Sequence, residues 1–450
     1  MWKKYKHHRD QNVYNEFKTL RLQIKNEICK SHRDYNIENK IKTDPSHFWS
    51  FIQSIRQENY FPKIMTYQNT ELLGAKPIVN TLASFFQESN IESDFNNMKT
   101  QSKIIAPNIL NINHFSEDEV YKALRKIKNK VTSGPDRISA FILRDCASIF
   151  AHPLSLIFNL SLTVRKYPTL WKDSIICPIF KKGDRKHIEN YRPITLLNNF
   201  SKVFEILLHT VIMNHVNSYI SPLQHGFVKG RSVETNLCMF TQFVTENIDA
   251  GTQVDTIYID FSKAFDRLDH YKLLDKLSSF GFSDNLIIFF ATYLTGRKQR
   301  VMCSGYESVE INVTSGVPQG SVLGPLFFNL FVNDITDNLT SPALLYADDM
   351  KLFRKITSRE DQLKLQADLQ LVCDRSKQCG LSINSAKCNV VTFSLKSKVL
   401  IFDYGIDNVQ VCRKNVIRDL GVTFDVKMTF IYHYEQIMSS ALKNLGFIIR

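Results

Sequence analysis

Adjacent carboxylates inside an apolar segment are the first candidates for chemistry. Asp348 and Asp349 follow Tyr346 and Ala347 and precede the residues Met-Lys-Leu-Phe at 350–353. Because like charges repel and burial disfavours ionisation, such a pair is costly unless a cation binds it. Mg²⁺ prefers oxygen ligands and commonly takes one or two carboxylates together with substrate phosphates. The pair is therefore either a metal site or a plain hairpin turn.

A second apolar segment ends in a carboxylate of the same kind. Residues 254–261 are β-branched and aromatic, as in a buried strand, and Asp260 stands near their end. If this strand lies beside the one that leads to Asp348, the two carboxylates could hold two metal ions roughly 3.5–4 Å apart, as in-line phosphoryl transfer requires. A plain hairpin favours Asn-Gly or Asp-Gly, and residues 347–351 contain no glycine, which favours the metal site.

A loop rich in glycine and proline occupies residues 316–325. Gly316 and Gly320 allow a ligand to approach the backbone closely, and Gln319 and Ser321 can donate hydrogen bonds to a phosphate or a base. The segment could also be a simple loop that caps the helical-looking residues 326–335.

Two basic segments could contact phosphates. Residues 179–194 predict a strand, a basic turn and a second strand, in which Lys181, Lys182 and Arg192 could clamp a triphosphate. Residues 224–232 form a basic glycine loop that could follow a nucleic-acid backbone. Taken alone, the first is better explained as a solvated basic hairpin and the second as an ordinary surface loop.

Composition limits the class of protein. The 450 residues carry a net charge of +13, which suggests a polyanionic partner such as nucleic acid. Hydrophobic residues make up 44% of the chain, enough for a sizeable core, so wholesale disorder is excluded. No apolar run approaches the roughly 18 residues of a membrane span, and the start lacks a secretory signal. The nine cysteines show no Cys-x-x-Cys pair, so we expect reduced thiols without disulfide partners in an intracellular compartment.

The elements that must position these residues mix strands with helices. We predict strands at 254–261, at 389–393 and, as a pair joined at 347–349, at 344–353. Ser116 and Glu119 form a capping box before a helix that includes 120–127. Further helices are predicted at about 151–165, 201–219, 270–280, 284–294 and 359–379. This order indicates an α+β architecture.

The N-terminal part differs from the rest. Val13, Phe17, Leu20, Ile24 and Ile28 recur at helical spacing in a basic segment, and Ser46 to Trp49 resembles the first turn of a second helix. Residues 59–108 are polar and irregular. We therefore predict a basic helical extension over 1–105 that precedes the main domain.

Taken together, these motifs resemble the reverse transcriptase of non-LTR (LINE-type, jockey-like) retrotransposons. The resemblance runs from about Tyr121 to Asp425 and covers most of the chain. Its motifs occur in the family's order, at 133–136, 181–184 with 192–194, 224–227 with 230–232, 260–266, 316–320, 346–349, 381–384 with Lys387, and 420–422.

The resemblance implies roles for individual residues. Asp260, Asp348 and Asp349 match the catalytic carboxylates, which with the backbone of Phe261 hold two Mg²⁺, for which Mn²⁺ could substitute. Further roles follow by motif: nucleotide binding by Lys182, Arg192, Phe265 (as a steric gate against ribose), Gln319 and Gly320; general acid by Lys387; primer grip by Leu420 and Gly421; and template backbone contact by Gly226, Lys229 and Arg231.

The resemblance also implies a fold and partners. It predicts a right-hand polymerase with fingers and palm over 106–425, a largely missing thumb that begins at 426–450, and a basic connector over 1–105. An RNA template, a DNA primer and dNTPs are the implied partners, and copying onto chromosomal DNA implies a nuclear step. The family's upstream endonuclease residues and Cys/His-rich tail are not found, and Arg137 replaces a common glycine. We therefore expect a fragment or a truncated copy.

Two other functions remain open at this point. One is another right-hand polymerase, of the group II intron type or a viral RNA-dependent type, although Phe265 argues against an RNA product. The other is a non-catalytic nucleic-acid-binding remnant, which the charge of +13 fits equally well.

Overall fold

The computed structural model describes residues 11–34, 61–91, 105–303 and 305–449. The chain divides into two compact units, Met1–Pro62 and Lys63–Arg450. In the first unit, helix α2 (Gln11–Asp34) confirms the predicted N-terminal helix. The predicted helix at Ser46 to Trp49 lies outside the described residues.

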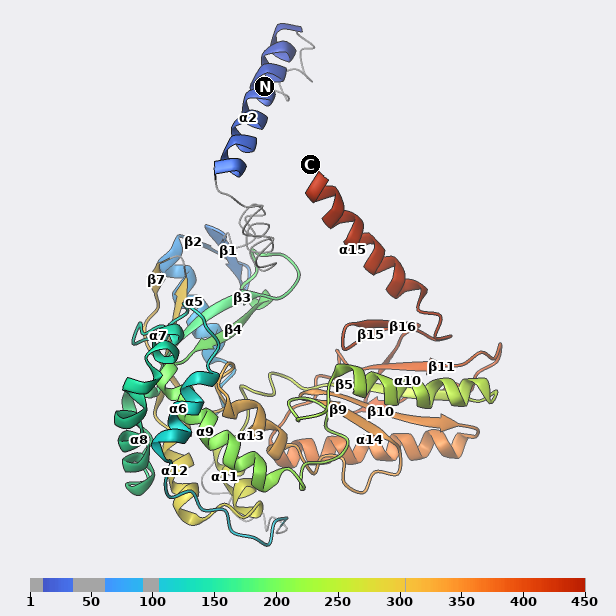
Figure 1. Ribbon diagram of the computed structural model, residues 1–450. Coiled ribbons are helices and arrows are strands. Elements are labelled where there is room, and N and C mark those ends of the chain that lie inside the picture. Colours follow the sequence, from blue (N-terminus) through green and yellow to red (C-terminus); the bar gives the residue numbers. More distant parts are fainter. Residues whose placement is uncertain (1–10, 35–60, 92–104, 304, 450) are drawn as a thin grey trace. The chain divides into compact units, whose positions relative to one another are not determined.

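The second unit contains a five-stranded sheet in the order β14-β11-β5-β10-β9 (Figure 1). Its strands are β5 (Gln253–Asp260), β9 (Ala343–Tyr346), β10 (Asp349–Ile356), β11 (Asn389–Phe393) and β14 (Cys412–Arg413). All neighbours are antiparallel except β11 and β14. The three strand segments predicted from β-branched and aromatic residues are therefore confirmed, including the two strands joined at 347–349.

Alternation along the strands buries both faces of this central sheet. Phe353 on β10 and Val254 on β5 belong to the apolar cluster that α10 (Val233–Asp249) completes with Phe240. Leu352 and Ile257, one residue out of phase, belong to the larger core that includes α14 (Arg359–Cys379). The sheet thus lies between α10 and α14 (Figure 1).

A second sheet has the order β4-β3-β6-β7, with β8 paired to β6. Its strands are β3 (Asp173–Phe180), β4 (Tyr191–Leu196), β6 (Arg297–Cys303), β7 (Tyr306–Glu307) and β8 (Ile311–Val313). The antiparallel pairing of β3 with β4 confirms the predicted strand, turn and strand at 179–194.

Residues 63–91 belong to the second unit, which corrects the prediction of an irregular segment there. They form β1 (Ile64–Tyr67), β2 (Thr70–Leu73) and α5 (Ala75–Gln87). Helix α5 buries Ile78, Val79, Leu82, Ala83 and Phe86, a helical spacing that the surrounding polar residues obscure. Because α5 packs on β6, β7 and β8, the compact unit begins at Lys63 and not at about residue 105.

Helices form the remainder of the core. They are α6 (Glu117–Lys126), α7 (Ala140–Asp145), α8 (Ala147–Thr163), α9 (Asn199–Val216), α11 (His270–Ser279), α12 (Asp284–Leu294) and α13 (Leu323–Phe331), with 3-10 turns at Thr169–Trp171 and Ile188–Asn190. The predicted capping box is present, since the N–H of Glu119 donates to Ser116 Oγ and the N–H of Ser116 donates to Glu119 Oε2. The helices predicted from apolar spacing are confirmed: α12 and α14 have the predicted ends, and the ends of α8, α9 and α11 differ by up to four residues.

The C-terminal part adds short elements. Strands β15 (Val416–Asp419) and β16 (Val422–Asp425) form a hairpin, β12 (Gly405–Ile406) pairs with β13 (Val409–Gln410), and α15 (Ile431–Ile449) follows. No helix among the described residues has the length and apolar character needed to cross a membrane. The cysteines whose side chains the structure describes are free thiols.

Candidate active site

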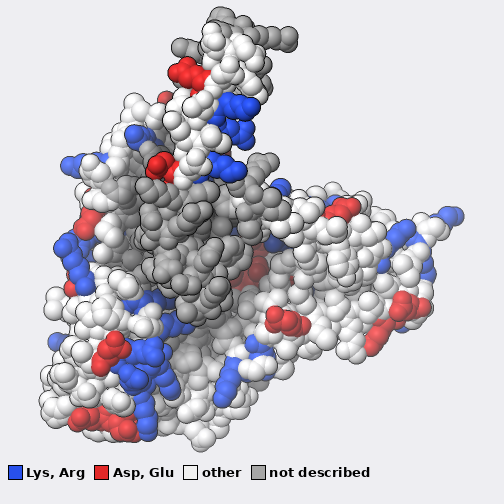
Figure 2. Space-filling model, turned by 45° about the horizontal axis from the view of Figure 1, so that its top comes forward, with Lys and Arg blue, Asp and Glu red and all other residues white. Residues whose placement is uncertain are grey.

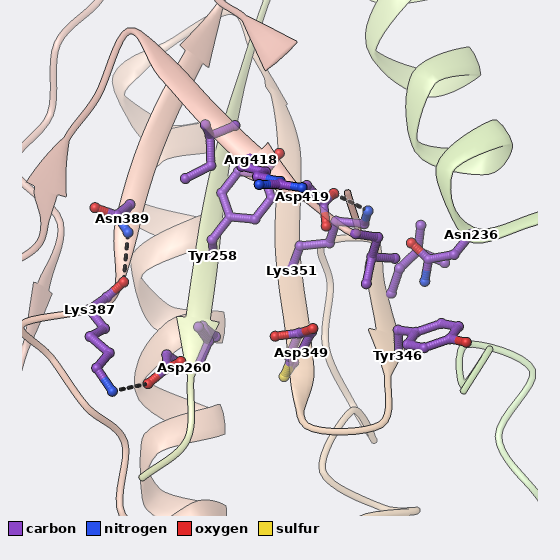
Figure 3. A pocket seen from close by; sticks show the side chains of 15 residues that line it. Asn236, Tyr258, Asp260, Tyr346, Asp349, Lys351, Lys387, Asn389, Arg418 and Asp419 are labelled. Atoms are coloured by element: carbon purple, nitrogen blue, oxygen red, sulfur yellow. Dashed lines mark hydrogen bonds and ion pairs between the residues drawn. The ribbon is translucent and has the colours of Figure 1, made fainter. Parts of the chain in front are cut away.

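The predicted carboxylates meet at one end of the central sheet. Asp349, the first residue of β10, lies opposite Asp260, the last residue of β5, in the antiparallel register. Asp348 precedes it in the turn, because Asp349 also pairs with Tyr346 of β9. Figure 3 shows Asp260 and Asp349 on these neighbouring strands. The predicted neighbourhood of the two strands is confirmed.

The carboxylates of this cluster repel one another. Burial raises the pKa of Asp349 to about 6, and the negative charges of Asp348, Asp419 and Asp260 add to this shift. Burial also raises the pKa of Asp348, with repulsion from Asp260. Crowded carboxylate oxygens of this kind fit a divalent cation, which removes the repulsion.

The cation has no complete protein ligand set of the usual kind in the described ranges. Among the described residues, no three His, Cys, Asp or Glu side chains are arranged so that they could coordinate one metal ion by themselves. Phe261, predicted to offer its backbone, is buried directly after Asp260 and pairs with Ile383 across an isolated bridge.

The turn between β9 and β10 is held from outside by Gln224. Ala347 has a φ of 57°, an unfavourable value for a residue with a Cβ. Its N–H donates to Gln224 Oε1 (3.0 Å), and the N–H of Gly226 donates to the same oxygen (2.8 Å). Two backbone bonds, from His225 N to Leu345 O and from Leu345 N to Leu223 O, join the segments further. Sequence reasoning placed Gln224 in a motif but assigned it no role.

Gly226 supports the turn, and its contact with a template backbone stays a prediction. It is buried, and a Cβ at this position would lie 2.4 Å from the backbone N of Ala347. Asn329 Nδ2 donates to Gly226 O (2.8 Å). Arg231 likewise donates to the carbonyls of Ser221 and Gln224, so its guanidinium holds the loop. Lys229 remains exposed.

Two lysines, Lys181 and Lys182, follow β3 where its ladder with β4 ends. Ile179 pairs with Arg192, and Lys181 N–H continues the ladder by donating to Asn190 O. Because Lys181 lies two positions beyond Ile179 in this ladder, alternation places it on the face of Arg192, whereas Lys182 lies in the bend that follows. Burial lowers the pKa of Lys181, the positive charges of Arg192, Lys387 and Lys182 lower it further, and Asp260 opposes the shift. Lys181 therefore accompanies Arg192 toward the carboxylates, and the role of Lys182 in nucleotide binding stays a prediction.

The 316–320 loop is fastened to the residues that follow β5. Gln319 Nε2 donates to Asp266 Oδ1 (2.8 Å), and Thr195 N–H of β4 donates to Gln319 O (2.8 Å). Gly320 has a φ of +124°, and a Cβ there would lie 2.7 Å from Thr195 O. Glycine at 320 is therefore required for this close approach.

Phe265 contacts both the 316–320 loop and the helix α13 that follows it. Its carbonyl accepts from Val317 N–H (3.0 Å), and its ring stacks on Phe328 with centroids 4.4 Å apart. The side chain is partly buried. Its packing is that of a core ring at a strand end, and this position is compatible with the predicted gate.

Glu205 is a buried carboxylate that the sequence analysis missed. Its Oε2 accepts from the N–H groups of Val322 and Leu323 at the start of α13, and Tyr293 OH donates to Oε1. Glu205 therefore caps the helix that follows the 316–320 loop. Burial raises its pKa, and the charge of Arg297 opposes the shift. A lone Glu in the apolar pattern of helix 201–219 was the available signal.

Lys387 lies beside the first carboxylate. Its Nζ is 3.7 Å from Asp260 Oδ2, and both side chains contact solvent. Asn384 N–H donates to Asp260 O, and Lys387 N–H donates to Asn384 O, which fastens this segment to the end of β5. The general-acid role stays a prediction.

Leu420 and Gly421 form the turn between β15 and β16, both with positive φ (45° and 93°). Leu420 lines a narrow cavity of about 160 Å³ together with Asp260, Asp349 and Lys387 (Figure 3). The structure thus brings the predicted primer grip to the carboxylates.

Positive charge occurs in more than one place on the visible face of the described residues. On the face that Figure 2 shows, Lys and Arg side chains occur in several groups, with Asp and Glu among them. The net charge alone therefore does not locate a nucleic-acid surface, and the geometry of the site carries that argument.

Comparison with known proteins identifies a family. A profile of the family described as reverse transcriptase (RNA-dependent DNA polymerase) matches residues 179–449. This range contains the three carboxylates, the 316–320 loop and the β15–β16 hairpin.

Individual relatives come from transposons of Drosophila melanogaster. The chain is 29% identical over 389 residues to a probable RNA-directed DNA polymerase from transposon X-element. The aligned region covers 83% of this chain and 42% of that protein. The chain is 28% identical over 338 residues to the RNA-directed DNA polymerase from mobile element jockey, which covers 72% of this chain and 36% of that protein. The chain thus spans less than half the length of these relatives.

The support by Gln224 generates one prediction. Gln224→Leu leaves the N–H groups of Ala347 and Gly226 buried without an acceptor, so we expect the free energy of unfolding to fall by about 2–4 kcal/mol. Urea unfolding followed by far-UV circular dichroism measures it. Gln242→Leu, at an exposed position of α10, is the control and should change little. Equal stability of the two variants would show that Gln224 does not hold the turn.

The repulsion between Asp349 and the neighbouring carboxylates generates a second prediction. In EDTA at about pH 8, we expect Asp349→Asn to raise the melting temperature by roughly 1–3 °C, a small effect because Asp349 keeps solvent contact. In the wild type, the Asp349 carboxyl has a pKa of about 6 in the folded state and an ordinary value of 3.8, so its ionisation destabilises the fold increasingly as the pH rises through this range. The gain in melting temperature on replacing Asp349 should therefore vanish near pH 4.

Added Mg²⁺ should stabilise the wild type more than this variant in the same thermal scan. Asp374→Asn, an exposed site on α14, is the control. A variant less stable than the wild type in EDTA at the higher pH would contradict charge crowding.

Proposed function

This chain belongs to the reverse transcriptase (RNA-dependent DNA polymerase) family, and we propose that it extends a DNA 3′-hydroxyl with deoxynucleotides on an RNA template. The observation that carries the proposal is the register that sets Asp349 opposite Asp260, with Asp348 beside them. The names of the relatives, RNA-directed DNA polymerases of mobile elements, support it.

The carboxylates would hold the metal. We assign Asp260, Asp348 and the backbone of Phe261 to two Mg²⁺, with Mn²⁺ as a substitute and Asp349 in support. When bound, the ions would lower the pKa of the primer 3′-hydroxyl and neutralise charge on the pyrophosphate. The raised pKa values of Asp348 and Asp349 support this assignment, because a cation favours their charged forms.

Basic side chains would bind the incoming triphosphate. Lys181 and Arg192 share one face of the β3–β4 pair, and charge coupling ties both to the carboxylates. Lys387, next to Asp260, is available to a phosphate oxygen or as a general acid for the pyrophosphate. Lys182, in the bend after Lys181, stays the contact that the motif predicts.

Three residues would select the nucleotide. Gln319, oriented by Asp266, and Gly320, close to β4, would contact its base and sugar. Phe265, backed by Phe328, would block the ribose 2′-hydroxyl. This gate favours DNA synthesis over RNA synthesis.

The family resemblance assigns the larger parts. The central sheet with α10 and α14 corresponds to a palm, the β3-β4-β6 sheet to fingers, and residues 426–450 to the start of a thumb. Lys229 is the predicted template contact that stays exposed. Target-primed copying of this kind would take place in the nucleus.

A primer-extension assay tests the function. With a primed RNA template, Mg²⁺ and dNTPs we expect extension by the purified chain, and Asp348→Asn should reduce the rate by roughly 10³-fold or more, because metal contacts are worth several kcal/mol. Asp374→Asn is the matched control, since its carboxylate lies on α14 away from the site.

Substrate choice completes this assay. Phe265→Ala should admit NTPs that the wild type rejects. Binding of the primed template without any extension would instead indicate a non-catalytic nucleic-acid-binding remnant, and extension with NTPs alone would indicate an RNA polymerase.

The two lysines generate a separate prediction. Lys181→Ala should raise the KM for dNTP by about tenfold or more, the usual effect of losing one charged contact, with a smaller change in kcat. Lys182→Ala, one residue further along in the exposed bend, is the matched comparison, and we expect it to change the KM for dNTP less. Steady-state extension at varied dNTP concentration measures both. The reverse order of effects would restore the motif-based assignment of Lys182.

A further inference from the structure

A buried ion pair joins the central sheet to the hairpin that carries Leu420 and Gly421. Lys351 Nζ lies 2.5 Å from Asp419 Oδ2, and the side chains are only 4% and 7% exposed. Lys351 follows Asp349 by two positions on β10, so it lies on the same face of the sheet. Asp419 ends β15 directly before Leu420. Figure 3 shows the pair above Asp349.

At its base, a backbone hydrogen bond joins the hairpin to the central sheet: Ser394 N–H, next to β11, donates to Val426 O, next to β16 (2.9 Å). Strands β15 and β16 form their own two-stranded sheet and share no ladder with the central one. Ile417 and Phe424 bury their side chains in the cluster around Phe240. Apolar burial is non-directional and the backbone bond lies at the base of the hairpin, so the position of the Leu420 turn over the carboxylates depends on a contact nearer the turn.

Lys351 is itself fixed by α10. Its ammonium group lies 4.5 Å from the centre of the Phe240 ring, a cation–π contact. Phe240 is fully buried and contacts the rings of Phe353 on β10 and Phe424 on β16. The contact with Phe240 therefore fixes the position of the ammonium group, and the ion pair fixes the position of Asp419 in turn.

We propose that Lys351 and Asp419 are positioning residues that set the place of the Leu420 turn relative to Asp260 and Asp349, and so align the 3′ end of a DNA primer. The alignment of a primer rests on the proposed function. Arg418, Asp419 and Leu420 line the same cavity as the two carboxylates, so a shift of the pair moves this cavity wall.

A role in stability alone accounts less well for this pair. Replacing a buried ion pair by apolar residues of similar volume is often neutral or stabilising, whereas removing one partner leaves an uncompensated charge. The double variant Lys351→Met/Asp419→Leu therefore removes orientation while it keeps burial. The single variant Lys351→Met should lower the melting temperature more than the double variant does.

Hydrogen exchange of the full chain tests the positioning without reference to activity. In the double variant we expect the amides of 416–425 to exchange about tenfold faster, because local opening of the hairpin becomes easier. The amides of β5 and β10 should keep wild-type rates. Wild-type rates in the hairpin, or an equal increase in β5 and β10, would overturn the proposal.

Primer binding tests the consequence. Fluorescence anisotropy with a labelled DNA primer on an RNA template should show about tenfold weaker binding by the double variant, since misplacement of a positioning contact is costly. The KM for dNTP at saturating primed template should not change. Lys377→Met, which removes one partner of the exposed Lys377–Asp407 pair, is the matched control.

The two proposals fail separately in these measurements. A wild-type chain that binds primed template and never extends it contradicts the proposed function, while the exchange and binding comparisons still decide the role of the pair. Unchanged primer affinity in the double variant would overturn that role even in an active enzyme.

Discussion

The antiparallel register of β5 and β10 is the constraint on which the site depends. It sets Asp260 opposite Asp349 and forces carboxylates of like charge together. Because side chains alternate along a strand, a slip of one residue would turn Asp349 to the other face and would remove Lys351 from the hairpin. The same register sends Leu352 into the core with α14. Burial of that apolar side chain therefore helps to hold an electrostatically unfavourable cluster in place.

The loops at the site depend on buried polar side chains from other elements. Gln224 satisfies two backbone donors at the β9–β10 turn, and Glu205 satisfies two at the start of α13. Such groups are costly when unpaired, so each network permits one arrangement of its loop. Loops that would otherwise vary in conformation thus present Asp348 and Gln319 in defined positions.

The sequence predicted those features that depend on local pattern. β-branched and aromatic residues located β5 and β10, and with them the neighbourhood of Asp260 and Asp349. The roles of Gln224 and Glu205 could not be predicted, because their partners lie more than a hundred residues away in sequence. Motif matching chose Lys182, and the coupling of its neighbour Lys181 to the carboxylates depends on the ladder to Asn190, which sequence patterns do not show. Helix α5 was missed because polar neighbours mask its apolar face.

The depth of the Lys351–Asp419 pair has a consequence for the response to ionic strength. Salt screens exposed charges strongly and buried pairs much less. The contact of Lys387 with Asp260 and any contacts with nucleic-acid phosphates would therefore weaken as salt rises, while the spacing between the hairpin and the carboxylates would not. Affinity for a polyanion and alignment of its end are thus separable in this molecule, because water and counterions reach the charges of the first and not those of the second.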